Sequence, residues 1–60
     1  MIARKKTRIL IVDDDPGHLT TLKTITKSWG YIAETANDGT IALEKVKSEP
    51  LDLVLMDVRF

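Results

Sequence analysis

Two apolar runs that each end in acid decide the fold of this chain: residues 9–15 read ILIVDDD, and residues 53–57 read LVLMD. Consecutive apolar residues with β-branched side chains are typical of a strand buried on both faces of a parallel sheet. Asp is depleted inside strands and favoured in turns, so each acid marks the end of its strand. The sequence therefore predicts strands over residues 8–12 and 51–56, with carboxylates at their C-terminal ends.

A helix is predicted between residues 15 and 30. Asp15 suits the N-cap, and Pro16 suits the first helical position, where a backbone N–H has no helical partner. Gly30 ends the helix. Large apolar residues recur at helical spacing and form one stripe: Leu19, Leu22, Ile25 and Trp29. We expect Trp29, and Tyr31 after the glycine, to be packing residues.

The rest of the chain predicts a further strand and a further helix. Residues 31–36 are short and partly alternating, which favours a strand less buried than the first. Residues 37–39 (NDG) are a turn and cap signal, and the apolar residues between 41 and 46 indicate a shorter helix. Pro50 ends that helix, because proline cannot continue it.

The order β-α-β-α-β implies an α/β fold with a parallel sheet and right-handed crossovers. Because the first and third strands look apolar on both faces, we expect helices on both faces of the sheet. Ligands bind such sheets beyond the carboxyl ends of the strands, where the strand order reverses. Acid at the ends of the first and third strands gives the local order 2-1-3 and makes Asp13, Asp14 and Asp57 neighbours in space.

Carboxylates this close repel each other, so either one takes a proton or a cation lies between them. Hard oxygen ligands suit Mg²⁺, which combines one or two carboxylates with water and phosphate. Asp57 can then act as a nucleophile toward a phosphoryl group, while Mg²⁺ held by Asp13 and Asp14 offsets the charge repulsion. The alternative is that each Asp only ends a strand. We expect His18 to be an exposed polar residue, and Asp15 and Asp38 to be caps.

Composition narrows the classes of function. A chain of 60 residues has room for one domain. Nine basic and nine acidic side chains give a net charge of zero, which argues against direct nucleic-acid binding. Without cysteine there is no disulfide or thiolate chemistry. The apolar runs are too short for a membrane span or a signal peptide, so we expect a cytoplasmic protein with no membrane contact.

These residues resemble the N-terminal half of a response-regulator receiver domain, the phospho-accepting module of two-component signalling. The similarity covers residues 8–59 through the segments RILIVDDD, WGY, ANDG, AL and DLVLMDVR. The sequence is most similar to receivers of nitrogen-regulation-type transcriptional activators. The resemblance implies a βαβαβ half of a flavodoxin-like doubly wound sheet. It also implies a signalling module rather than an enzyme, whose intact parent receives phosphate from a sensor histidine kinase.

The resemblance also assigns roles to single residues. Asp57 matches the phosphorylated aspartate, Asp14 the direct Mg²⁺ ligand, and Asp13 the ligand that often acts through water. The backbone carbonyl of Arg59 matches the third protein ligand. A full receiver continues through two strands and three helices that supply a Ser or Thr and a Lys around the phosphoryl group. We therefore expect a basic lead-in at residues 1–7 and a truncated receiver at residues 8–60, with impaired phosphotransfer.

A third strand without a further neighbour has an open edge, which is a template for another strand. We expect a homo-oligomer through this strand, in which two copies pair symmetrically into one continuous sheet. The alternative function is a non-signalling association or folding unit in which the acids have no role.

Overall fold

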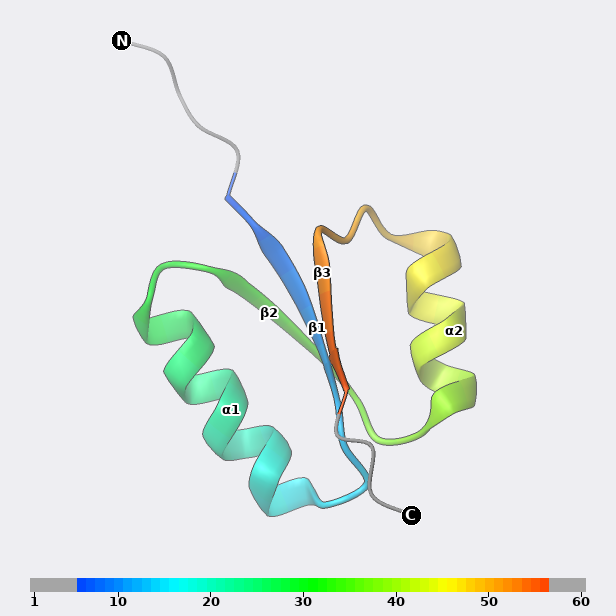
Figure 1. Cartoon of the computed structure of the whole chain (residues 1–60), viewed down its shortest axis with the longest axis horizontal. Helices are drawn as coiled ribbons and strands as arrows, with labels where there is room; N and C mark the ends of the chain where they lie inside the picture. The colour runs from blue at the N-terminus through cyan, green and yellow to red at the C-terminus, as the bar shows by residue number, and fades with distance from the viewer. Residues whose placement is uncertain (1–5, 57–60) are drawn as a thin grey trace, which may run out of the picture.

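The computed structural model describes residues 6–56, which alternate between strand and helix (Figure 1). The elements in chain order are β1 (Arg8–Val12), α1 (Pro16–Ser28), β2 (Ile32–Ala36), α2 (Gly39–Ser48) and β3 (Leu53–Met56). The sheet has the order β2-β1-β3 with both pairings parallel, so the predicted α/β fold and the local order 2-1-3 are confirmed. Two strands begin later than predicted, β2 at Ile32 and β3 at Leu53.

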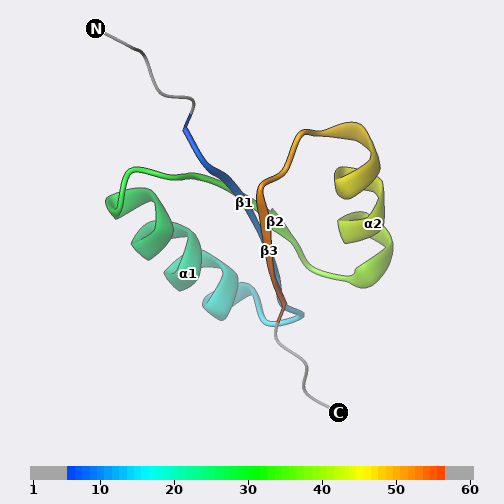
Figure 2. The same ribbon diagram turned by 45° about the horizontal axis from the view of Figure 1, so that its top comes forward.

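The two helices lie on opposite faces of the sheet, as the two views show (Figures 1 and 2). This follows from the topology, because right-handed crossovers that leave β1 and β2 in opposite lateral directions must pass over opposite faces. β1 is the central strand, and its residues Leu10 and Ile11 are fully buried. β2 is less buried than β1, as the sequence predicts.

The start and end of α1 follow the local chemistry of the sequence. Asp15 is the N-cap, and its Oδ1 accepts a hydrogen bond from the Gly17 N–H at 2.8 Å. Pro16 occupies the first helical position. Gly30 follows the helix with φ of 90°, a left-handed conformation that other residues rarely adopt. The predicted helix boundaries are therefore confirmed.

The second helix is capped in the same way. Asp38 is the N-cap of α2, and its Oδ1 accepts a hydrogen bond from the Ile41 N–H at 2.8 Å. The Lys45 ammonium donates to the Thr35 carbonyl oxygen at 2.8 Å and ties α2 to β2. Between β1, β2 and α2 lies the core cluster of Leu10, Val12, Ala36 and Ala42, with Leu51 packed against it.

Arg8 organises the N-terminal end of the sheet. Its guanidinium contacts one carboxylate oxygen each of Glu34 on β2 and Glu49 at the end of α2, both at 3.4 Å. Its backbone N–H donates to Asp52 Oδ2 at 2.8 Å, and its carbonyl oxygen accepts from the Asp52 N–H at 2.9 Å. All three strands and α2 are therefore joined around one residue.

Two predictions about packing are wrong. Trp29 is 70% exposed and Tyr31 is 40% exposed, so neither is a core residue, and the deeply buried residue of α1 is Thr26. All residues of β3 are exposed as well, although its sequence predicts burial on both faces. The reason is that, within residues 6–56, both helices pack on β1 and β2 and neither packs on β3. The apolar sequence of β3 indicates that its faces can be buried, but no helix within residues 6–56 covers them.

Candidate functional site

The candidate site lies where β1 ends and α1 begins. Asp13 directly follows β1, and its N–H donates to the Ala36 carbonyl oxygen at 3.2 Å, which continues the pairing with β2 by one residue. The residue is buried, with 4% of its surface exposed, whereas its neighbour Asp14 is exposed. Burial of a carboxylate is costly unless its oxygens are hydrogen-bonded or paired with a charge.

Both oxygens of the Asp13 carboxylate have a partner. Oδ1 accepts a hydrogen bond from the Asp15 N–H at 3.0 Å, and Oδ2 lies 3.2 Å from Nδ1 of His18. The first contact comes from the turn that leads into α1, and the second comes from the first turn of the helix itself. The orientation of Asp13 is thus set by the same local geometry that starts α1.

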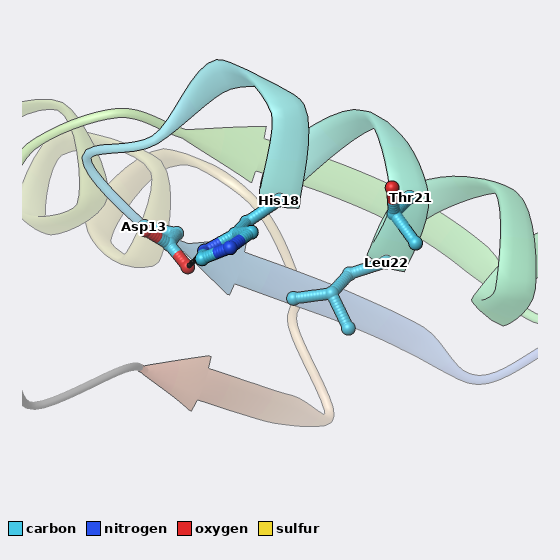
Figure 3. A pocket seen from close by; sticks show the side chains of 4 residues that line it. All are labelled: Asp13, His18, Thr21 and Leu22. Atoms are coloured by element: carbon cyan, nitrogen blue, oxygen red, sulfur yellow. Dashed lines mark hydrogen bonds and ion pairs between the residues drawn. The ribbon is translucent and has the colours of Figure 1, made fainter.

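His18 is the residue whose contacts the sequence reasoning missed. Its side chain is 51% exposed, in line with the expected exposed polar residue, yet it faces Asp13 and lies 3.6 Å through Nε2 from Asp15 Oδ2. A hollow of about 320 Å³ adjoins it, lined by Asp13, His18, Thr21 and Leu22 (Figure 3). The available signal was positional: a side chain three residues after an N-cap returns toward the acid that precedes the helix.

The register of the sheet aligns the ends of β1 and β3. Val12 and Met56 are paired residues, and Asp13 and Asp57 follow them directly in the chain. Asp57 and Arg59, both predicted site residues, lie outside the described residues. A second hollow, of about 260 Å³, adjoins this end of the sheet and is lined by Ile11, Val12, Leu22, Leu55 and Met56.

The remaining predicted residues fall where expected. Asp15 and Asp38 are helix caps, as their sequence context indicates. Asp13 and Asp14 both lie at the C-terminal end of β1, the central strand, which is the edge of the sheet predicted to hold the site. Within residues 6–56 there is no group of three or more His, Asp or Glu side chains arranged to hold a metal ion.

Comparison with known families identifies the domain, because residues 9–60 match the response regulator receiver domain. The chain belongs to this family. The match includes the segments that end β1 and β3, and the strand order agrees with half of a flavodoxin-like receiver fold. Receiver domains are signalling modules, so the family also supports the expected role in two-component signal transduction.

Individual relatives agree with this assignment. The chain is 51% identical over 51 residues to the transcriptional regulatory protein ZraR of Klebsiella oxytoca and to that of Escherichia coli (strain K12), which covers 85% of the chain and 12% of each relative. It is 34% identical over 58 residues to the sensor histidine kinase GacS of Pseudomonas protegens, covering 97% of the chain and 6% of the relative. No solved structure matches the chain significantly.

The chain therefore spans about an eighth of the length of the ZraR proteins that it resembles, at 12% coverage. In the described part of the chain, neither helix has the length and apolar character needed to cross a membrane.

Proposed function

We propose that this chain is a phospho-accepting receiver segment in which Asp57 takes a phosphoryl group from a sensor histidine kinase. The observation that carries the proposal is the parallel pairing of Val12 with Met56, since the acids Asp13 and Asp57 follow these aligned residues directly. The carboxyl ends of neighbouring parallel strands are where α/β sheets bind their ligands. Membership of the receiver family supports the same assignment.

The cofactor that suits this site is Mg²⁺. The donor set fits: a buried Asp13 carboxylate beside an exposed Asp14 offers hard oxygen atoms, and an exposed ligand leaves room for the waters that Mg²⁺ retains. Asp14 is proposed as a direct ligand and Asp13 as a ligand through water. The Asp57 carboxylate and the backbone carbonyl of Arg59 are the other proposed protein ligands. When bound, the ion neutralises charge on the phosphoryl oxygens.

In the proposed reaction an Asp57 carboxylate oxygen attacks the phosphorus of a phosphohistidine. The new O–P bond forms as the P–N bond breaks, and the departing imidazole keeps the electron pair of that bond. Phosphoryl transfer demands mainly positioning and charge stabilisation. Asp13 and Asp14 would contribute by holding Mg²⁺ close to the Asp57 carboxylate.

Magnesium titration of the ¹⁵N-labelled chain tests the first half of the proposal. Saturable amide shifts are expected at Asp13 and Asp14, whereas Trp29 fluorescence is a poor reporter, because this residue lies beyond the opposite end of α1 from the site. Acetyl phosphate followed by intact mass spectrometry tests the second half, with Asp57→Asn as the matched control. A phosphoryl adduct of equal yield on Asp57→Asn would remove Asp57 from its role.

A second candidate function is self-association without signalling, favoured by the exposure of every residue of β3. Within residues 6–56, β3 pairs with β1 alone, so its other edge is open to a strand. The proposed occupant is β3 of a second copy of this chain, because antiparallel pairing of the two edges joins two sheets symmetrically. Both functions are compatible in one molecule, since the open edge and the acidic end are different parts of the sheet.

A further inference from the structure

His18 joins the helix to the acidic end of the sheet. Its Nδ1 lies 3.2 Å from Asp13 Oδ2, which is within hydrogen-bonding distance, whereas its Nε2 lies 3.6 Å from Asp15 Oδ2, which is beyond it. The two distances favour a ring in which Nδ1 carries the proton and donates to Asp13. Figure 3 shows the imidazole turned toward the Asp13 carboxylate along the wall of the hollow.

The carboxylate that receives this bond has little freedom to adopt other partners. The Asp13 side chain is only 2% exposed, so solvent cannot replace a lost donor easily. Its Oδ1 is already engaged by the Asp15 N–H at 3.0 Å. The donor to Oδ2 therefore contributes to setting the rotation of the carboxylate about its Cβ–Cγ bond.

We propose that His18 is a positioning residue for the cation site: by donating from Nδ1 to Asp13 Oδ2, it fixes the carboxylate orientation that Mg²⁺ binding requires. The inference rests on the proposed function, since it assumes that Asp13 belongs to the Mg²⁺ site. Partners that orient ligating carboxylates typically change metal affinity by about 10–100-fold when they are removed. The contact of His18 with the proposed ligand set is made to Asp13, so it acts through this carboxylate rather than on the ion.

The position of His18 allows this role to be separated from folding. Its side chain is 51% exposed and lies in the first turn of α1, so its replacement leaves no buried cavity. Loss of the donor removes one hydrogen bond from a buried carboxylate and is expected to lower the urea unfolding midpoint, so each variant is first shown by circular dichroism to be folded under the conditions of the Mg²⁺ titration. A change in Mg²⁺ affinity can then be assigned to the site.

Two substitutions distinguish donation from mere bulk. His18→Asn places an amide N–H close to the position of Nδ1, whereas His18→Leu fills similar space without a donor. In Mg²⁺ titrations followed by amide shifts, His18→Leu is expected to raise the Kd by about tenfold and His18→Asn by less than about threefold. An unchanged Kd in His18→Leu, or equal weakening in both variants, would overturn the positioning role.

A second readout needs no metal. His18 is the only histidine in the sequence, so its imidazole ¹⁵N signals can be assigned without ambiguity. The expected spectrum is that of the Nδ1–H tautomer in the wild type, with a change toward Nε2–H in Asp13→Ala. A wild-type chain that shows this tautomer but no Mg²⁺ response would refute the proposed function. A chain that binds Mg²⁺ with the Nε2–H tautomer would refute only the inference about His18.

Discussion

Substitution of Leu10 by Ala should remove most of the stability of this domain. Leu10 lies at the centre of β1 with 0% of its surface exposed, and it belongs to the core cluster. Because Leu10 is fully enclosed, its neighbours cannot close the cavity that the alanine would leave. The expected loss in the free energy of unfolding is therefore about 3–5 kcal/mol. A domain of this length has a total stability of roughly 3–9 kcal/mol. The variant is thus expected to be largely unfolded, or to unfold at low urea concentration.

The matched control is Leu43→Ala, which removes the same atoms from α2 at a position that is 55% exposed. Its expected effect is below about 0.5 kcal/mol, since it leaves no cavity. Both variants are compared with the wild type by urea unfolding followed by far-ultraviolet circular dichroism at one protein concentration. Equal losses in the two variants would refute the reasoning, because stability would then not depend on the burial described around β1.

Four further predictions concern the cap, the helix end, the cation site and the open edge. Asp15→Ala should lower the free energy of unfolding by about 1 kcal/mol, measured by urea, because the Gly17 N–H loses its acceptor. Gly30→Ala should cost about 1–2 kcal/mol in the same assay, since φ is 90° there, and a stabilised variant would contradict that conformation. Asp14→Ala should abolish the Mg²⁺-dependent amide shifts without changing the urea midpoint, and a surviving response would remove Asp14 from the site. Val54→Lys places a charge on β3 at a residue that is 40% exposed, and it should convert dimers to monomers in sedimentation velocity. A wild-type chain that is already monomeric at high concentration would exclude association through β3.

Local signals in the sequence were sufficient for the elements and their order. Asp15 and Pro16 define the start of α1 because capping depends on backbone geometry within one turn. The strand order followed from the acids at two strand ends, because ligand-binding residues of such sheets gather where the order reverses. These inferences need no knowledge of what lies across the sheet.

The packing of Trp29 was not predictable in the same way. Helical spacing groups Leu22, Ile25 and Trp29 on one side of α1, but it does not say how much of that side the sheet covers. Ile25 is 40% exposed and Trp29 is 70% exposed, since the helix packs on β1 and β2 only. The contact between His18 and Asp13 has a local origin instead, because it forms across the turn from β1 into α1, and its sequence signal is the position of His18 three residues after the N-cap.

The two ends of β1 differ in their contacts, and Arg8 is responsible for those at the N-terminal end. At this end Arg8 binds Glu34, Glu49 and Asp52 through ion pairs and a hydrogen bond. At the C-terminal end of β1 lie the proposed site residues Asp13 and Asp14. The two ion pairs are partly buried, with 25–30% of each side chain exposed, and both use the same guanidinium, so loss of one glutamate leaves the other pair in place. Substitution of Glu34 or Glu49 is therefore expected to change the stability of the N-terminal end of the sheet while leaving the proposed site at its C-terminal end unchanged.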